Sequence, residues 1–172
     1  LLLIFSVLVP CQSLHAATVP LDELSIESVG LTIAIAGDGT YNFSGPVSPP
    51  AVITMGAYQD PLLGGTGWKV YTTTAYGNPA PSGTVDTTAG SIDVDLSSLR
   101  AQASITILGS PYMLDIPLWP LINPPSSGTY DSGTNAFTLD WSNTFSGLVG
   151  GFYPVSGTVA VSLAGYATPV PI

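Results

Sequence analysis

Two stretches of the chain carry aspartates in nearly the same places. They read SGTVDTTAGSIDVDL (82–96) and SGTYDSGTNAFTLDW (127–141). The letters DSG at 131–133 also spell the aspartic-protease motif, but that chemistry needs a pair of carboxylates that share a proton. The first copy has DTT at the same place. We therefore interpret Asp86 and Asp131 as turn residues and not as a catalytic pair.

The hydrophobic pattern around these aspartates predicts two hairpins of the same design. In both copies a four-residue loop after the aspartate places an apolar pair on one face: Val85 with Ile92, and Tyr130 with Phe137. Each aspartate then occupies the first position of a turn, where its carboxylate can accept backbone N–H groups. The loops end at Gly90 and Asn135, residue types that readily adopt positive φ.

Three other aspartates are the candidate ligands for a metal ion. Asp93 and Asp95 lie two apart on a predicted strand and therefore face the same way, and Asp140 takes the place of Asp95 in the second copy. Calcium needs about six to eight oxygen ligands, and no Asp-rich loop with calcium-binding spacing is present. We expect a solvated face here, with calcium as the alternative, and no cofactor.

Aromatic side chains offer another kind of site, because flat rings exposed on a β-protein stack on sugars. Tyr112 and Trp119 lie in PYMLDIPLWPLINPP (111–125), where five prolines predict an irregular loop. Such an apolar loop either caps the end of the fold or binds a ligand. Trp68 begins a Thr-rich strand and joins them as a carbohydrate-binding candidate, whereas Trp141 alternates with core residues and is expected to be buried.

The beginning of the chain indicates export. LLLIFSVLV and the later LHAAT match the apolar and cleavage regions of a secretory signal peptide, residues 1–17, with cleavage after Ala16 or Ala17. Lipidation at Cys11 is the alternative, although Pro10 departs from a bacterial lipobox. No later stretch approaches the roughly 20 apolar residues of a membrane-spanning helix. We expect membrane attachment only through Cys11 or through an anchor beyond Ile172.

Composition argues against most enzyme classes. Removal of residues 1–17 also removes the only histidine and the only cysteine, which excludes Cys/His nucleophiles, Ser-His-Asp triads and the usual zinc ligands. Only carboxylate chemistry, such as that of glycosidases, is left open, and we expect no enzyme. The two basic residues stand against 11 acidic ones, for a net charge of −9. Nucleic acid is therefore not expected as a partner, because its phosphates would be repelled.

Period-two alternation, with 19 glycines and 16 prolines, predicts an all-β fold. We expect a single domain (18–166), an antiparallel β-sandwich or open barrel of about 8–10 strands, followed by a Pro-rich tail (167–172). The prolines of 46–50 are expected to form a loop between strands. The predicted strands are 26–36, 40–44, 52–58, 68–76, 83–85, 91–96, 101–108, 129–130, 136–141 and 155–163.

The hydrophobic register predicts a three-residue loop, Gly37-Asp38-Gly39, for the first hairpin. This loop pairs Ile35 with Tyr41 and Ile33 with Phe43. A two-residue turn would mix apolar and polar residues on each face.

The last fifty or so residues resemble exported proteins of Gram-negative bacteria that end in PEP-CTERM-type sorting signals. The resemblance lies in SGTYDSGTNAFTLDW, the Gly-rich sequence after it, the closing strand SGTVAVSL and the terminal PVPI, which supplies the start of a Val-Pro-x-Pro motif. It implies display at the cell surface or incorporation into an extracellular (biofilm) matrix, with polysaccharide or other matrix proteins as partners. It brings no catalytic residues with it.

We therefore expect an exported, non-enzymatic surface or matrix protein. One alternative is a carbohydrate-binding module that uses the exposed aromatics. Another is a fibre subunit in which the strand of residues 24–36 inserts into a neighbouring copy. The competing interpretation is that this strand pairs with residues 40–44 of its own chain.

Overall fold

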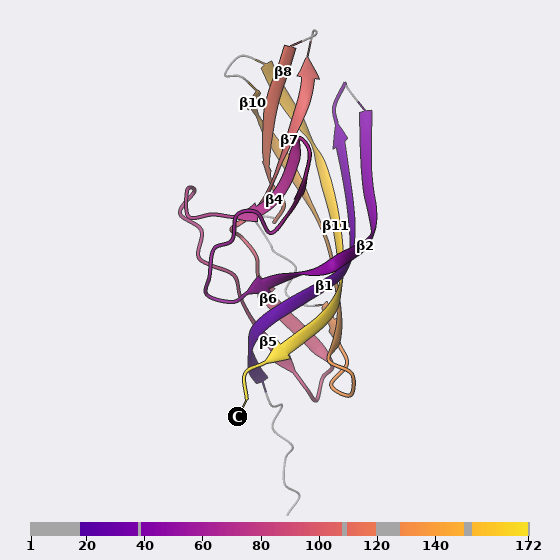
Figure 1. Cartoon of the computed structure of the whole chain (residues 1–172), viewed down its shortest axis with the longest axis vertical. Coiled ribbons are helices and arrows are strands. Elements are labelled where there is room, and N and C mark those ends of the chain that lie inside the picture. The colour runs from indigo at the N-terminus through magenta and orange to yellow at the C-terminus, as the bar shows by residue number, and fades with distance from the viewer. Residues whose placement is uncertain (1–17, 38, 108–109, 120–127, 150–152, 172) are drawn as a thin grey trace, which may run out of the picture.

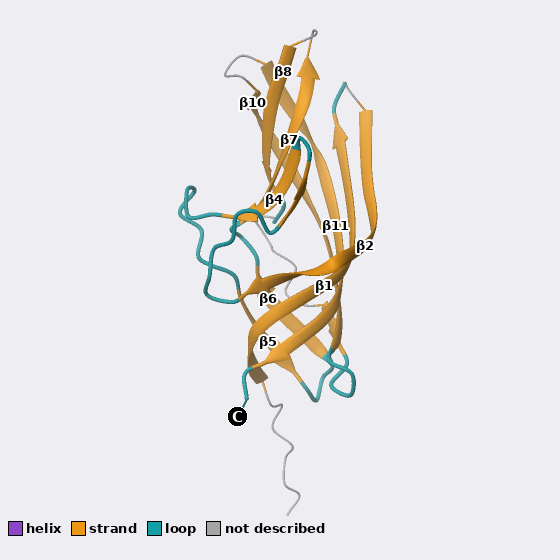
Figure 2. Ribbon diagram, in the orientation of Figure 1, coloured by secondary structure: helices purple, strands orange, loops and turns teal. Residues whose placement is uncertain are grey.

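The chain is all-β, as predicted. The computed structural model describes residues 18–37, 39–107, 110–119, 128–149 and 153–171, and this part of the chain forms strands and no helix (Figure 2). Accordingly, none of the described residues belongs to a helix able to cross a membrane. The predicted signal peptide, with Cys11 and His15, lies outside the described residues.

The described strands are β1 (Thr18–Ile35), β2 (Gly39–Thr54), β3 (Leu63–Gly65), β4 (Trp68–Thr72), β5 (Ser82–Asp86), β6 (Ser91–Asp95), β7 (Leu99–Ile107), β8 (Ser110–Pro117), β9 (Gly128–Tyr130), β10 (Ala136–Val149) and β11 (Tyr153–Pro169).

Six of these strands close into a barrel. The order β1-β11-β10-β9-β6-β5 returns to β1, and every neighbouring pair is antiparallel. β2 pairs with β1 outside this ring and forms an edge of the sheet. The barrel occupies the lower half of the molecule as drawn, where the C-terminal end of β11 also lies (Figure 1).

The upper half of the molecule is a sandwich. The second sheet, in the order β3-β4-β7-β8, packs against the upper parts of β1, β2, β10 and β11 (Figure 1). One side of this sandwich is closed by two contacts from β10: Trp141 Nε1 donates to the Leu118 carbonyl (2.6 Å), and Asn143 Nδ2 donates to the Trp119 carbonyl (3.1 Å). On the other side, Phe43 of β2 and Trp68 of β4 bring the two sheets together, with ring centroids 6.2 Å apart.

A bulge in β1 marks the change from barrel to sandwich. The pairing of β1 with both β11 and β2 shifts between Ile26 and Ser28, and such a shift bends a strand. Opposite the bulge, Gly165 of β11 allows the two strands to come close, because a Cβ there would overlap the Ser25 carbonyl oxygen. One apolar core runs through both halves.

The repeated hairpins have the predicted register. Val85 faces Ile92 and Tyr130 faces Phe137. Gly90 and Asn135 have φ values of 67° and 61°. Both aspartates accept backbone N–H groups: Asp86 Oδ1 from Thr88 and Ala89 at 2.9 and 2.8 Å, and Asp131 Oδ1 from Gly133 at 2.8 Å. Both carboxylates therefore hold turns, as the sequence predicts.

Asp131 is expected to make stability fall in acid. The Gly133 N–H, together with the Thr134 hydroxyl, lowers the pKa of the Asp131 carboxyl below its ordinary 3.8. The stabilisation is therefore present above about pH 4 and is lost as the pH falls through the lowered pKa. Asp131→Asn should remove this part of the acid sensitivity, measured as the thermal midpoint of both proteins between about pH 2 and about pH 6. Parallel pH profiles would contradict the prediction.

The first hairpin differs from prediction by a shift in register. Ile35 pairs with Gly39, Ile33 with Tyr41, and Leu31 with Phe43, so the three-residue loop spans 36–38 and not 37–39. The shift is two residues in pairing and keeps the apolar side chains on one face. Gly37, with a φ of 82°, occupies the position that needs a left-handed residue. Asp38 lies outside the described residues.

Two Pro-rich segments were wrongly predicted as loops. Residues 46–50 belong to β2, and residues 111–117 of the predicted loop 111–125 belong to β8. Residues 120–125 of that loop lie outside the described residues. Both strands lie at the edge of a sheet, where proline is tolerated because one side of the backbone needs no hydrogen bond. The end of the chain differs as well, since β11 continues to Pro169, into the expected tail.

The strand considered as a donor for a neighbouring copy is internal. Residues 24–35 of β1 lie between β11 and β2 of the same chain. This is the pairing within one chain that the hairpin pattern favours. The structure therefore offers no support for its insertion into another subunit.

Candidate functional site

The aromatic residues predicted to bind carbohydrate do not form one surface. Trp119 is buried, with 1% of its surface exposed. It packs edge-on against Trp141 at a centroid distance of 4.8 Å. Tyr112 is partly buried against the core. Of the three candidates, Trp68 is the most exposed, at 39%, and offers its ring to a ligand. Leu118 and Trp119 instead lie against β10 and cap the sandwich.

The three candidate calcium ligands lie on two strands: Asp93 and Asp95 on β6, and Asp140 on β10. Asp93 and Asp140 are exposed on β6 and β10. Asp95 accepts the Ser97 N–H at 2.9 Å and thus holds the turn that follows β6. Among the residues that the structure describes, no group of three acidic, histidine or cysteine side chains is placed to hold a metal ion.

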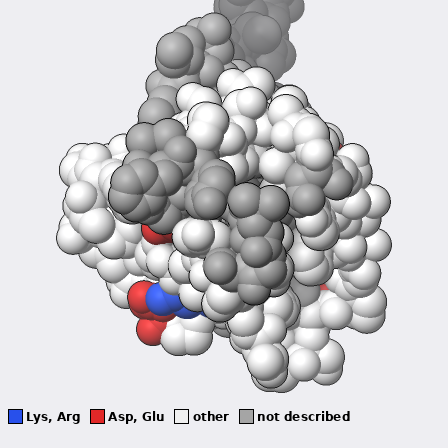
Figure 3. Space-filling view, turned by 90° about the horizontal axis from the view of Figure 1, so that it is seen from above, with Lys and Arg blue, Asp and Glu red and all other residues white. Residues whose placement is uncertain are grey.

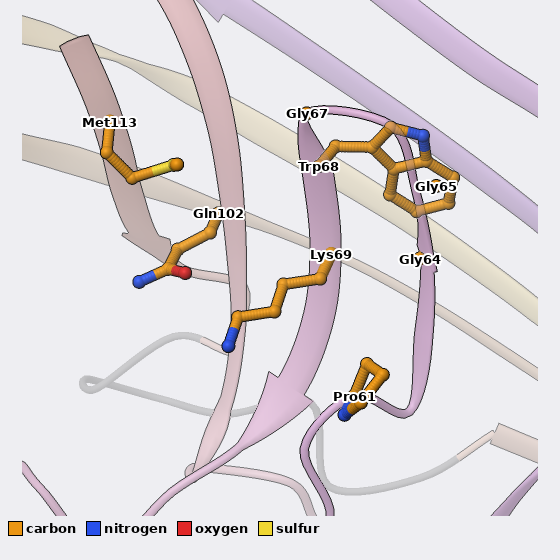
Figure 4. Close-up of a pocket in the computed structure, with 8 residues that line it drawn as sticks. All are labelled: Pro61, Gly64, Gly65, Gly67, Trp68, Lys69, Gln102 and Met113. Carbon is orange, nitrogen blue, oxygen red and sulfur yellow. The ribbon is translucent and has the colours of Figure 1, made fainter.

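A groove crosses the outer face of the second sheet (Figure 4). It has a volume of about 450 Å³ and takes its lining from all four strands and their connections: Pro61, Gly64, Gly65, Gly67, Trp68, Lys69, Gln102 and Met113. The glycines leave backbone exposed as the floor of the groove. Gln102 and the Lys69 ammonium provide polar groups, while Met113, Trp68 and the aliphatic stem of Lys69 provide apolar walls.

Strand pairing explains why these side chains meet. Lys69 on β4 pairs with Gln102 on β7, and Gln102 pairs with Asp115 on β8. Residues paired across antiparallel strands point to the same face of the sheet. The same row therefore carries a lysine, an amide and a carboxylate across three strands, and these come from parts of the sequence far apart from one another.

Asp115 is the centre of a polar cluster beside the groove. Its Oδ1 accepts from Arg100 Nε at 2.8 Å, and its Oδ2 accepts from the Tyr71 hydroxyl at 2.8 Å and, more weakly, from Tyr76 at 3.3 Å and Gln102 Nε2 at 3.4 Å. The Arg100 guanidinium also stacks on the Tyr76 ring, 3.8 Å from its centroid. This cluster connects β4, β7, β8 and the segment that follows β4.

The cluster alters the ionisation of Tyr71. Burial raises the pKa of the Tyr71 hydroxyl to about 12, and the hydrogen bond to Asp115 and its negative charge add to the effect. Tyr71 therefore stays protonated and remains a hydrogen-bond donor at neutral pH. Its role is to hold Asp115 in place.

Both basic residues of the chain lie on this face, and both are paired with acids. Lys69 Nζ is 2.7 Å from Asp60 Oδ1, and Arg100 is paired with Asp115. The end-on view shows blue atoms directly against red ones on an otherwise mostly uncharged surface (Figure 3). The outer face of the second sheet is therefore close to neutral, although the whole chain carries −9.

This arrangement suits an uncharged ligand rich in hydroxyl groups. Ligand sites commonly combine apolar walls with a few fixed polar groups, and here Gln102, Lys69 and exposed backbone are those groups. Sequence reasoning identified Trp68 but missed Lys69, Gln102, Met113 and Asp115. One signal in the sequence could have indicated this face. The chain has only two basic residues, Lys69 and Arg100, and each lies in a predicted strand or directly beside one.

Comparison of this chain with models of protein families, with curated proteins and with solved structures found no match.

Proposed function

We propose that this chain is an exported, non-enzymatic protein of the cell surface or extracellular matrix that binds neutral polysaccharide. The observation that carries this proposal is the groove on the outer face of the second sheet. The N-terminal sequence supports export, and the resemblance of the C-terminal part to exported proteins with PEP-CTERM-type signals supports the surface location. Of the aromatic residues predicted to bind carbohydrate, the proposal keeps Trp68 and leaves out Trp119.

The chemistry of the groove favours a neutral ligand. A polyanion would meet a chain of net charge −9, and both cations near the groove are already neutralised by Asp60 and Asp115. Sugar hydroxyls can donate to carboxylates and carbonyls and accept from amide and amine groups. The exposed Met113 and Trp68 can cover the apolar faces of sugar rings. An open groove also accommodates a chain that continues at both ends.

Two groove variants test the proposal. Gln102→Ala removes a polar group of the groove, and Trp68→Ala removes an apolar wall. We expect the full chain to bind a neutral glucan such as laminarin or dextran, and each variant to bind about tenfold more weakly, because one lost hydrogen bond or ring contact is worth about 1–1.5 kcal/mol. Isothermal titration calorimetry measures both affinities.

The control is Tyr166→Ala, which removes another exposed aromatic from β11, at the barrel end of the molecule. Its affinity should equal that of the unchanged chain. Alginate, a polyanion, should bind weakly or not at all. Absence of binding to every neutral polysaccharide tested, or equal affinity of Gln102→Ala, Trp68→Ala and the control, would refute the groove as the site.

A further inference from the structure

The free edge of β2 is the longest exposed strand edge in the described part of the chain. β2 ends the order of the seven-stranded sheet and pairs only with β1. An edge of this kind presents unpaired N–H and C=O groups that can accept another strand. Pro46, Pro49 and Pro50 protect the second half of the strand. The first half, Gly39–Gly45, has no proline and no charged residue.

The sequence of this first half is chemically symmetrical. It reads Gly-Thr-Tyr-Asn-Phe-Ser-Gly, centred on Asn42. If the segment pairs antiparallel with a copy of itself about Asn42, glycine faces glycine, Thr40 faces Ser44, Tyr41 faces Phe43 and Asn42 faces Asn42. Each position thus meets its own chemical class, and hydroxyl and aromatic pairs across strands are favourable.

Exposure and charge favour the same pairing. The Tyr41 and Phe43 side chains are 42% and 41% exposed, and a second copy would cover them with its own Phe43 and Tyr41. Two chains that each carry −9 repel one another over most of their surface. The uncharged Gly39–Gly45 segment lets their edges meet without a direct pair of like charges.

We infer that this protein forms a symmetric dimer by antiparallel pairing of Gly39–Gly45 with the same segment of a second copy. The interface is isologous, so it closes at two chains and does not produce a fibre. It joins the seven-stranded sheets of the two copies edge to edge. The polysaccharide groove lies on the other sheet, although its Trp68 contacts Phe43 of this edge. The dimer does not depend on the proposed function.

Cysteine cross-linking tests the register. In the full chain carrying Cys11→Ser, Asn42→Cys places two thiols opposite each other on the symmetry axis. Cα atoms of directly opposite residues are about 4.5–5.5 Å apart, within the usual range for a disulfide. Thr40→Cys is the matched control on the same edge and face, because its copy lies four residues away, or about 13 Å. Mild oxidation should cross-link Asn42→Cys rapidly and Thr40→Cys hardly at all.

Sedimentation of unmodified and charge variants tests the association itself. We expect dimers that strengthen as salt rises from about 0.05 to about 0.5 M, because salt screens the repulsion. Asn42→Asp keeps the oxygen that accepts from the Thr32 hydroxyl but sets two carboxylates face to face, and should weaken the dimer at least about tenfold. Asn78→Asp adds the same charge in a loop and should change the dimer dissociation constant less than about twofold. A monomer under all conditions, or equal cross-linking at 40 and 42, would overturn the inference.

Discussion

Replacing Trp119 with alanine is expected to lower the free energy of unfolding by about 3–5 kcal/mol, the usual cost of deleting a large buried aromatic side chain. Trp119 is 1% exposed and packs edge-on against Trp141, so the variant loses both the buried area and the ring contact. The loss should appear as a lower midpoint of denaturant unfolding with an unchanged slope, followed by circular dichroism.

Trp68→Ala is the control for this experiment. Because Trp68 is partly exposed, its replacement should lower the free energy of unfolding by about 1 kcal/mol or less. The two tryptophans are therefore expected to show opposite behaviour: Trp119→Ala destabilises the fold, and Trp68→Ala weakens ligand binding. A Trp119→Ala protein of normal stability that no longer binds polysaccharide would instead restore Trp119 as a ligand contact.

The second large effect is expected at Asp115. Asp115→Asn keeps the shape of the side chain but leaves the Arg100 guanidinium, whose side chain is 10% exposed, without its counter-charge. Removal of one partner from a fully buried ion pair costs about 3–5 kcal/mol. Because Asp115 keeps 23% of its side chain exposed, we expect a smaller loss of about 2–3 kcal/mol. Urea unfolding of both proteins measures it.

The titration of Tyr71 provides an independent readout of the same change. The pKa of about 12 in the folded protein comes first from burial and then from Asp115, so Asp115→Asn should lower it toward the ordinary 10.0. Since the folded pKa is raised, Tyr71 stabilises the unchanged protein below about pH 10 and loses this effect as the pH rises toward 12. Ultraviolet absorbance of the tyrosinate follows the titration.

Asp60→Asn is the matched control for Asp115→Asn. It breaks the other ion pair on the same face, where the Lys69 and Asp60 side chains are 32% and 49% exposed. Exposed pairs contribute about 0–1 kcal/mol, and the Tyr71 titration should not move. If both variants lose the same stability, Asp115 does not have the central role that its four side-chain partners indicate.

The hairpins at Asp86 and Asp131 could be predicted from the sequence because their determinants are local. A turn aspartate, a residue of positive φ and one apolar pair lie within about ten residues of each other. Alternation likewise predicted most strands and the all-β class. The register of the first hairpin was harder, because two registers that differ by two residues place the same side chains on the same face.

The second sheet could not be predicted as a unit, because its central pairing joins β4 to β7, two segments that are far apart in the chain. β3 has only three residues and pairs with the neighbouring β4, and so short a strand shows no alternation. β8 was rejected as a strand on account of its prolines, and only its position at the edge of the sheet makes them acceptable. The groove and the Asp115 cluster both depend on the row in which Lys69, Gln102 and Asp115 meet, and local spacing carries no information about that row.

Amide chemical-shift mapping during titration with the neutral polysaccharide that binds best is the most direct test of the proposed function. The groove predicts that perturbations concentrate on β3, β4, β7 and β8, with the side-chain amide of Gln102 among the largest, while the barrel strands β5, β6 and β9 stay unchanged. Perturbations centred on the barrel, or spread evenly over the surface without saturating, would contradict the assignment of the groove as the polysaccharide site.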